Sequence, residues 1–266
     1  MDGALSSPST GTDHLAGKRV VVTRAVDQAA DLCERLERLG AEVVRCPTIR
    51  TAPPSSFDEM DRALSDIGSY GWVVFTSVNG VSSARDRLAQ LGLGPAHLST
   101  TPVAVVGPST RRVLEDWGVG VAFVPDEYHA DRLAETLAPV SGESVLLLRA
   151  DIGKSTVAQV LEGRGARVDD VVAYRTLTVP PKESALVELR KGVHAVTFTS
   201  PSTVRGFAEA GPGWRDLVDG VIIATIGPST SAAAREAGLE VHIEAVEHTT
   251  QGLVTALVRF AEEAWK

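Results

Sequence analysis

Residues 36–51 read LERLGAEVVRCPTIRT and residues 161–176 read LEGRGARVDDVVAYRT, and this match decides the fold. In both stretches a helical pattern ends at a glycine, and a short run rich in β-branched residues follows. A repeat at a fixed spacing indicates that one structural unit occurs more than once in a chain. The two stretches therefore predict two copies of one strand-and-helix unit.

Four further pairs of segments match in the same order. The pairs are VVVTR at 20–24 with VLLLR at 145–149, FTSVNGV at 75–81 with FTSPSTV at 198–204, VVGPST at 105–110 with TIGPST at 225–230, and EYHADRLAETL at 127–137 with EHTTQGLVTAL at 247–257. The spacing between partners stays between 120 and 125 residues. Because chance rarely produces ordered matches at one spacing, we interpret them as an internal duplication.

Each copy alternates apolar runs with helical patterns. Apolar residues at positions 29, 32, 33, 36 and 39 share one helix face, and Gly40 ends that helix as a C′ glycine. Strand–helix alternation favours parallel sheets covered by helices on both faces. The predicted fold class is therefore α/β, with two flavodoxin-like parallel-sheet lobes and a cleft between them. Strands are predicted at 20–23, 72–76, 103–106, 119–124, 145–148, 168–173, 196–199, 222–226 and 241–243.

The composition is that of a globular protein, with 266 residues of which 44% are hydrophobic and 23% charged. No apolar run is long enough to cross a bilayer. Residues 1–16 are predicted to be a disordered tail, because they are polar and lack the apolar centre of a signal peptide. Cys33 and Cys46 show no motif spacing, so we expect two buried residues of a reducing cytosol. The net charge of −8 argues against a nucleic-acid binder and requires local donors for any polyanionic ligand.

Four strand-to-helix turns are rich in small and hydroxyl residues: 76–80, 107–110, 199–202 and 227–230. In open α/β sheets, ligands bind at the carboxyl ends of strands. The free N–H groups of a helix N-terminus suit a carboxylate or a phosphate, but serine and threonine are also the preferred N-caps of any helix. Each turn is thus an anion site or a cap, and a duplication copies both.

Familiar catalytic signatures are missing from the sequence. It has no phosphate-binding loop, no complete dinucleotide fingerprint, no nucleophile elbow, no paired histidines on a helix and no cysteine pair for zinc. We therefore expect either an enzyme that uses no metal, cofactor or covalent nucleophile, or a protein that only binds its ligand.

The motifs quoted above, together with VLEDWGV, VVAYRT and AAAREAGL, run in the order found in uroporphyrinogen-III synthases, which the chain resembles over about residues 18–264. The resemblance implies a discontinuous lobe formed by 17–48 plus 178–262 and a second lobe formed by 53–173. It also implies that residues 49–52 and 174–177 pair as a two-stranded β-ribbon linker. Composition alone would place a boundary near 139–142.

The resemblance further implies the reaction. Members of this family cyclise hydroxymethylbilane, a chain of four pyrroles with acetate and propionate groups, to uroporphyrinogen III with inversion of ring D and loss of water. The enzyme must orient a flexible substrate and assist departure of its hydroxyl group. Such an enzyme is a lyase of tetrapyrrole and haem biosynthesis that needs no cofactor and no metal.

Tyr174 matches the family tyrosine that is proposed to assist loss of the hydroxyl group. A phenol stays protonated at neutral pH and can donate a hydrogen bond. Two alternatives stay open. Tyr174 is a residue that packs at a linker, or a carboxylic acid of the substrate supplies the proton instead.

The same resemblance places substrate carboxylates against the turns and against basic side chains. Arginine can bind a carboxylate through two hydrogen bonds. The alternative for the basic residues is a surface salt bridge, for instance between Arg149 and Asp151. The implied substrate-binding residues are Arg24, Ser77, Asn79, Ser109, Thr110, Arg149, Lys154, Ser200, Ser202, Ser229 and Thr230.

The resemblance also implies a cytoplasmic monomer and allows a transient contact with the upstream deaminase that makes the substrate. Neither a nucleic acid nor a membrane is expected as a partner. The main alternative is a non-catalytic regulatory protein with the same fold that binds tetrapyrroles or anions. A second alternative is a two-lobed sugar-phosphate or nucleotide enzyme, against which the missing phosphate-loop and dinucleotide signatures argue.

Overall fold

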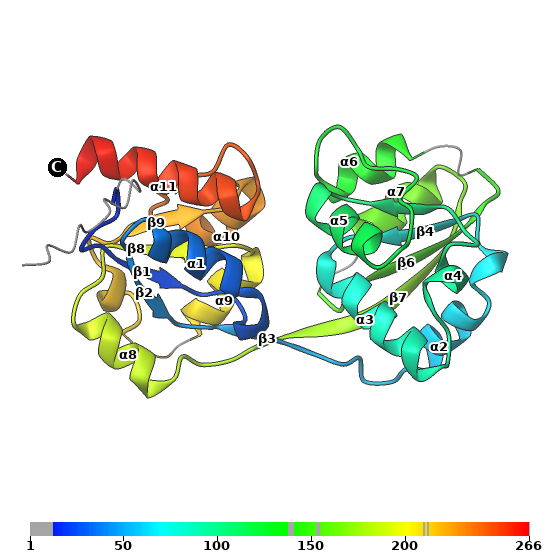
Figure 1. Cartoon of the computed structure of the whole chain (residues 1–266), viewed down its shortest axis with the longest axis horizontal. Helices are drawn as coiled ribbons and strands as arrows, with labels where there is room; N and C mark the ends of the chain where they lie inside the picture. The colour runs from blue at the N-terminus through cyan, green and yellow to red at the C-terminus, as the bar shows by residue number, and fades with distance from the viewer. Residues whose placement is uncertain (1–12, 138–140, 153–154, 210, 212, 266) are drawn as a thin grey trace, which may run out of the picture. The chain divides into compact units, whose positions relative to one another are not determined.

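The computed structural model of the chain describes residues 13–137, 141–152, 155–209, 211 and 213–265, and Figure 1 shows their helices and strands. The chain forms two compact units. The discontinuous unit has two chain segments, of which the first ends at Arg50 and the second begins at Leu177. The continuous unit spans Thr51–Thr176. Each unit has its own sheet and its own hydrophobic core.

The sheet of the discontinuous unit has the order β10-β9-β8-β1-β2, and its neighbouring strands are parallel. Numbered by their order within this unit, the strands run 2-1-3-4-5 from β2 to β10, which is the flavodoxin-like order. Buried parallel strands need apolar side chains on both faces, as the central strands here have. The strands are β1 (Arg19–Val22), β2 (Glu42–Arg45), β8 (Ala195–Phe198), β9 (Ile222–Thr225) and β10 (Ile243–Glu244).

Helices cover both faces of this sheet (Figure 1). Val20 and Val22 point to one core and Val21 to the other, as strand alternation requires. Helices α1 (Ala30–Arg38) and α11 (Thr250–Ala264) pack over the first core. Over the second core pack α8 (Glu183–Arg190), α9 (Pro201–Ala208) and α10 (Pro228–Glu236).

Helix α1 shows why the predicted helical pattern works. Leu32, Cys33 and Leu36 are fully buried, and the polar residues of the other face are exposed or half-buried. Gly40 follows the helix with a φ of 86°, a left-handed conformation that glycine adopts without strain. The prediction of this helix and of its glycine stop is confirmed.

The sheet of the continuous unit has the order β3-β7-β6-β4-β5, and β4, β5, β6 and β7 are parallel. By position in the repeat, β5, β4, β6 and β7 correspond to β9, β8, β1 and β2. Matching strands therefore have matching neighbours in the two sheets. The strands are β3 (Ile49–Ala52), β4 (Trp72–Phe75), β5 (Val103–Val105), β6 (Ser144–Ala150) and β7 (Arg167–Thr178).

Helices again lie on both faces. Val73 and Phe75 point to the core under α2 (Asp58–Ser65), α3 (Val78–Gln90) and α5 (Pro108–Asp116). Val74 points to the core under α6 (Ala130–Thr136) and α7 (Thr156–Gly163). The remaining short elements are α4 (Pro95–Leu98) and the 3₁₀ turns η1 (Val26–Gln28), η2 (Ile67–Ser69) and η3 (Asp216–Val218).

The predicted strand at 119–124 is wrong. In this run only Phe123 makes a bridge, to Ala104 of β5, at the sheet edge where the discontinuous unit has the two-residue strand β10. Gly118 and Gly120 weaken the run, and Pro125 ends it, because neither residue type supports a strand interior. The prediction also omitted β2, whose outer residues are charged because it is an edge strand.

The predicted disordered tail of residues 1–16 is too long. Leu15 is fully buried in the core of the discontinuous unit, and its N–H donates to the carbonyl of Leu39 at 2.9 Å. His14 also pairs with Glu262 at 2.9 Å. A single leucine in a polar stretch has no periodicity, so its burial left no signal in the sequence.

None of the helices in the described ranges combines the length and the apolar character that a bilayer crossing needs.

Candidate functional site

The carboxyl ends of four strands carry predicted residues of the continuous unit. Ser77 follows β4, Ser109 and Thr110 follow β5, Arg149 lies near the end of β6, and Tyr174 lies in β7. These strands are adjacent in the order β5-β4-β6-β7. Because the strands are parallel, all five residues lie on the side of the sheet formed by the carboxyl ends of its strands. Open α/β sheets bind ligands on this side, the ligand-binding edge.

Ser77 and Tyr174 are in direct contact. The Ser77 hydroxyl is the N-cap of α3 and accepts a hydrogen bond from the N–H of Gly80 at 3.2 Å. The same oxygen lies 3.0 Å from the phenol oxygen of Tyr174, and either group can donate. Tyr174 is 8% exposed and packs in the core of the unit. The pair therefore places a buried phenol beside the positive end of a helix.

The two Gly-Pro-Ser-Thr turns begin α5 and α10, and in both a glycine is the N-cap. Thr110 is 6% exposed and Thr230 is 1% exposed. Among the described residues, neither threonine hydroxyl makes a hydrogen bond. Neither hydroxyl oxygen is a fully buried polar atom without a partner. Both hydroxyls are therefore available to a ligand, as are the exposed Ser109 and Ser229 beside them. The cap interpretation is wrong for these four side chains.

The cap interpretation is confirmed for Ser77 and for Ser200. Ser200 begins α9, and its hydroxyl accepts from the N–H of Thr203 at 3.3 Å while Thr203 Oγ1 accepts from the N–H of Ser200 at 3.3 Å. This reciprocal arrangement is a capping box. In the first turns of the two helices, Ser202 accepts from Arg205 at 3.4 Å and Asn79 is half-buried.

Arg24 is a half-buried cation next to a helix N-terminus. Its guanidinium reaches Gln28 and Thr250, the first residue of α11, each at 3.4 Å. It forms no salt bridge with any residue that the structure describes. Burial lowers the pKa of Arg24, an effect that Asp31 and Asp27 oppose, and an arginine remains charged in proteins. Such a group suits the carboxylate of a ligand.

Arg149, which matches Arg24 in the repeat, is already engaged. Its Nε and Nη2 lie 2.6 and 2.8 Å from the two carboxylate oxygens of Asp170, and Nη1 donates to the carbonyl of Ala150 at 2.6 Å. The expected partner Asp151 instead accepts from the N–H of Thr176 at 3.0 Å. Arg149 therefore forms a salt bridge, as the alternative predicted, but its partner is Asp170 and not Asp151.

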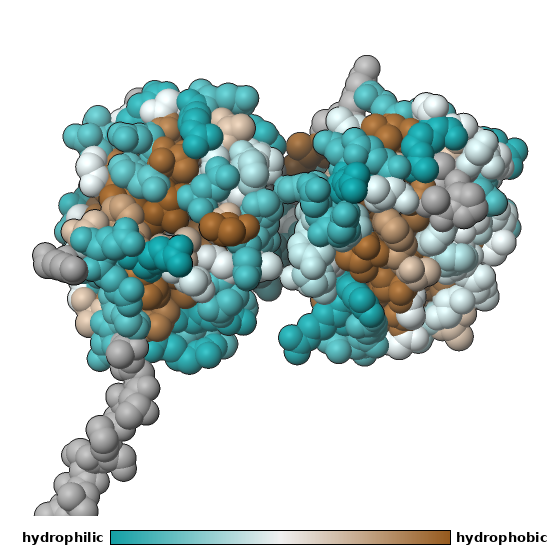
Figure 2. Space-filling view, turned by 90° about the horizontal axis from the view of Figure 1, so that it is seen from above, coloured by the Kyte–Doolittle hydropathy of each residue, from teal (hydrophilic) through white to brown (hydrophobic). Residues whose placement is uncertain are grey.

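Large apolar side chains are exposed near the same sheet edges. Val26 follows β1, Ile152 follows β6 and Val246 follows β10. Exposed Tyr128 packs on the Gly-Pro-Ser-Thr turn of α5, 3.6 Å from where a β-carbon on Gly107 would lie. On the face shown in Figure 2, hydrophobic residues interrupt the polar surface of both units. Each edge thus offers apolar contacts beside hydrogen-bond donors, which suits a ligand with apolar rings and carboxylates.

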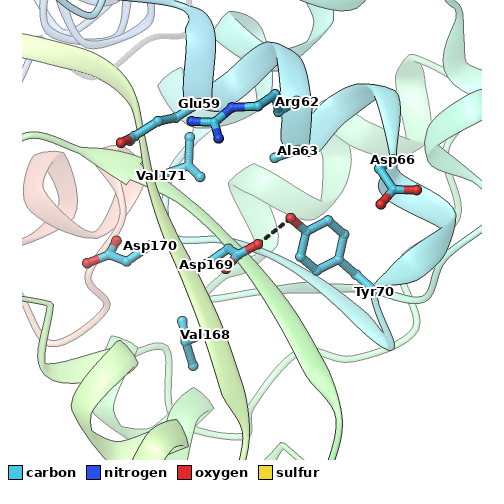
Figure 3. A pocket seen from close by; sticks show the side chains of 9 residues that line it. All are labelled: Glu59, Arg62, Ala63, Asp66, Tyr70, Val168, Asp169, Asp170 and Val171. Carbon is cyan, nitrogen blue, oxygen red and sulfur yellow. Dashed lines mark hydrogen bonds between the residues drawn. The ribbon is translucent and has the colours of Figure 1, made fainter.

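A separate surface pocket of about 390 Å³ lies between α2 and the first half of β7 (Figure 3). Tyr70 donates a hydrogen bond to Asp169 at 2.5 Å, and burial, followed by this carboxylate, raises the pKa of Tyr70. Four carboxylates and one arginine line the pocket, so its field repels anions, and it does not suit a polycarboxylate. The lining residues are Glu59, Arg62, Ala63, Asp66, Tyr70, Val168, Asp169, Asp170 and Val171.

In the part of the chain that the structure describes, no group of three or more histidine, cysteine, aspartate or glutamate side chains is arranged to hold a metal ion. Cys33 and Cys46 are buried and free, as expected. Burial raises the pKa of both thiols, that of Cys46 to about 12. Lys154, predicted as a substrate contact, lies outside the described residues.

Three residues near the predicted positions were not predicted from the sequence: Tyr128, His248 and Asp170. The repeat places Tyr128 opposite His248, whose ring lies against the matching turn of α10, so the shared motif contained a signal for both. Asp170 occupies the position at which the other copy has Arg45. No local pattern connects Asp170 with Arg149, because their contact depends on the pairing of β6 with β7.

A protein-family model described as uroporphyrinogen-III synthase HemD matches residues 30–255. The chain is 34% identical over 260 residues to the uroporphyrinogen-III synthase of Synechococcus elongatus, a match that covers 94% of this chain and 97% of that protein. It is 31% identical over 232 residues to the uroporphyrinogen-III synthase of Chlorobaculum parvum, covering 85% of this chain and 92% of that protein.

The fold is also similar to a solved structure, that of a mutant uroporphyrinogen III synthase from the extremely thermophilic bacterium Thermus thermophilus. The TM-score is 0.65 at 18% identity, and the match covers 93% of this chain and 100% of that chain. At this identity the likeness establishes the α/β fold with two parallel sheets.

Proposed function

Because the chain belongs to the uroporphyrinogen-III synthase family, we propose that it converts hydroxymethylbilane into uroporphyrinogen III, with inversion of ring D and loss of water. The reaction makes the protein a lyase of tetrapyrrole biosynthesis, and it needs neither a metal nor a cofactor. The observation that carries the proposal is the contact between Tyr174 and Ser77 at the ligand-binding edge of the continuous unit.

The Tyr174–Ser77 pair suits the first chemical step. The carbon–oxygen bond of the hydroxymethyl group breaks, the oxygen leaves as water after gaining a proton, and the pyrrole nitrogen supplies electrons to the cation that forms. Tyr174 donates the hydrogen bond or the proton to the leaving oxygen. The positive end of α3, where Ser77 accepts the Gly80 N–H, stabilises negative charge that develops on the phenol oxygen. A carboxylic acid of the substrate is the alternative donor.

The substrate carboxylates bind at helix N-termini, where free N–H groups and hydroxyls can donate to them. The available hydroxyls of Thr110 and Thr230 support this, as does the charge of Arg24, which no carboxylate of the described residues pairs with. We include the serines and the asparagine of the same turns in the proposed contacts: Ser77, Asn79, Ser109, Ser200, Ser202 and Ser229. Lys154 stays a prediction, and Arg149 is already paired with Asp170.

We also propose that the two units descend from one duplicated unit. The same neighbour order of matching strands in the two sheets supports this. The lobes are residues 17–48 plus 178–262 and residues 53–173, joined by a ribbon of 49–52 and 174–177. The position of β3 next to β7 in the sheet order supports the ribbon.

The activity is tested with hydroxymethylbilane made freshly by the deaminase in the same vessel. The products are oxidised and their ring isomers are separated by chromatography, with a heat-inactivated sample as the control. We expect the type III isomer to dominate. A product that stays type I, as in the control, would contradict the proposal and favour the non-catalytic alternative, which direct binding of tetrapyrroles would then examine.

The monomeric state, the cytoplasmic location and a transient contact with the deaminase stay predictions. Size-exclusion chromatography of the protein, alone and mixed with the deaminase, tests the first and the third.

A further inference from the structure

The continuous unit contains an ion pair for which the proposed chemistry has no direct use. Arg149 and Asp170 are joined by two hydrogen bonds, and their side chains are 15% and 27% exposed. With the bond from Nη1 to the carbonyl of Ala150, every nitrogen of the guanidinium has a protein acceptor. Arg149 is therefore not a free cation waiting for a substrate carboxylate, unlike Arg24.

This ion pair lies beside an irregularity in the pairing of β6 with β7. Residues from Ser144 to Arg149 pair one to one with residues from Arg167 to Val172, but Ala150 pairs with Tyr174. Strand β7 therefore contains one extra residue, Ala173, which makes a β-bulge. Bulges re-aim side chains and are common next to active sites.

The bulge explains where the phenol points. In a regular strand, successive side chains lie on opposite faces of the sheet. Here Ala173 and Tyr174 are consecutive, yet both pack in the same core, together with Phe75 of β4. This is the face on which Tyr174 reaches Ser77, two residues beyond Phe75. Without the extra residue, Tyr174 would lie on the other face.

Polar contacts hold the bulge on both sides. Before it, Arg149 joins Asp170 of β7 to the carbonyl of Ala150 in β6. After it, the N–H of Asp151 donates to the carbonyl of Tyr174 at 3.0 Å, and Asp151 Oδ1 accepts from the N–H of Thr176 at 3.0 Å. The ion pair is the part of this arrangement that a side-chain change removes most cleanly.

We propose that Arg149 and Asp170 are positioning residues for Tyr174. Their ion pair holds the bulged register of β6 and β7, and so keeps the Tyr174 phenol at the Ser77 hydroxyl. Arg149 affects the reaction through Tyr174 and not by binding a substrate carboxylate. The kinetic consequence rests on the proposed function, whereas the positional consequence does not.

The kinetic test is a double-mutant cycle of Asp170→Asn with Tyr174→Phe. Asp170→Asn keeps the size of the side chain but loses the two-pronged acceptor. We expect kcat to fall about 10-fold and KM to change less than about twofold, because a displacement of ~1 Å can cost this much and more. In the Tyr174→Phe background the same change should have no further effect on kcat, since no phenol remains to be positioned.

The chain offers a matched control in the same unit. Arg87 of α3 and Asp61 of α2 form a bidentate pair at 2.5 and 2.6 Å, with side chains that are 20% and 29% exposed. Arg87 lies ten residues beyond Ser77 along the helix, about 15 Å away. Asp61→Asn should leave kcat within about twofold of the wild-type value.

A crystal structure of Asp170→Asn gives a readout that needs no activity. We expect the hydrogen bond between Tyr174 and Ser77 to be lost. The proposal is overturned if this bond persists, if the fall in kcat is equal in both backgrounds, or if KM rises instead, which would make Arg149 a substrate contact.

Two further arms keep the outcome decisive. If the wild-type protein makes no type III isomer, the proposed function fails, and the crystal structure still decides the positioning role. If the Asp170→Asn chain does not fold, Arg149→Lys replaces it in the same cycle, because lysine keeps the charge but not the fork geometry. Asp170→Glu, which restores a carboxylate, should recover part of kcat.

Discussion

Strands β4 and β8 each end at a phenylalanine that Thr-Ser follows, and the two turns use the serine differently. Ser77 caps α3 and also contacts the phenol of Tyr174. Ser200 caps α9 and is engaged in a reciprocal capping box with Thr203. The shared serine thus caps a helix in both units, and only in the continuous unit does it also contact a tyrosine phenol.

Two positions beyond the shared Phe-Thr-Ser account for this difference. The third helix residue is Gly80 in one turn and Thr203 in the other, and a β-carbon on Gly80 would lie 3.2 Å from the carbonyl oxygen of Leu148. A side chain there would crowd the strand. The position that matches Tyr174 in the repeat is Ile49, which has no polar group to offer. The presence of the same N-cap serine in two turns therefore does not predict its chemical role, which depends on the residues that contact it.

The largest effect is expected where α9 approaches the backbone most closely. A β-carbon on Gly206 would lie 2.2 Å from the carbonyl oxygen of Thr48, so Gly206→Ala should destabilise the protein by about 3 kcal/mol in urea unfolding. Gly80→Ala has more room and should cost about 1 kcal/mol. The control is Gly163→Ala, with no atom within 4 Å, which should be neutral or slightly stabilising. Equal urea midpoints for all three variants would contradict the close approach of α9 to Thr48.

The next largest effect is expected on catalysis, from loss of the phenol that only the continuous unit places beside its serine. Tyr174→Phe removes the phenol oxygen that contacts Ser77 and should lower kcat about 100-fold, the lower range for a general acid. KM should change little. Tyr70→Phe, which alters a tyrosine of the same unit in the acidic pocket, is the control. An unchanged kcat in Tyr174→Phe would assign the proton to a substrate carboxylic acid.

The two serines can be compared directly. Ser77→Ala and Ser200→Ala each remove an N-cap and should each destabilise the protein by about 1 kcal/mol. Ser77→Ala should also lower kcat about fivefold, the equivalent of one hydrogen bond to the phenol. Ser200→Ala should raise KM and leave kcat unchanged. If both variants changed the same kinetic constant, the two turns would have the same function and the distinction would be lost.

The smallest effect concerns acid stability and distinguishes the units. His194 accepts a hydrogen bond from the N–H of Arg19 at 3.0 Å, whereas the continuous unit has Gly71 at the matching position. Burial, with the nearby charges of Lys18 and Arg19, lowers the pKa of His194. The folded state therefore resists protonation of His194. The contribution of His194 to the free energy of unfolding is fully present above pH ~6.5 and is lost as the pH falls through the lowered pKa.

The measurement compares urea unfolding at about pH 7.5 and about pH 5.5 in wild type and in His194→Asn, whose amide oxygen can still accept from Arg19. The substitution should reduce the loss of stability on acidification. The same pH dependence in both proteins would show that His194 is not responsible.

The buried strands were predictable because their signal is local. The centres of β4, β8 and β9 are apolar on both faces, and the predicted strands agree with the observed ones to within about one residue at each end. Edges were less predictable. At the outer edges, β2 has a charged residue at each end and residues 119–124 make only one bridge, because an edge strand has one neighbour and tolerates polar residues.

The sequence by itself determined the repeat, the α/β class, the glycine that ends α1 and the location of polar residues at the carboxyl ends of strands, since each depends on residues close together in the chain. Only the tertiary structure decided which of those residues are engaged by protein partners and which are available to a ligand. Arg24 and Arg149 occupy matching positions, but among the described residues only Arg149 has a carboxylate partner. Tyr174 meets Ser77 across 97 residues of chain because a bulge in β7 turns it to that face. Strand pairing and the register of a bulge are set by long-range packing, and no local pattern encodes them.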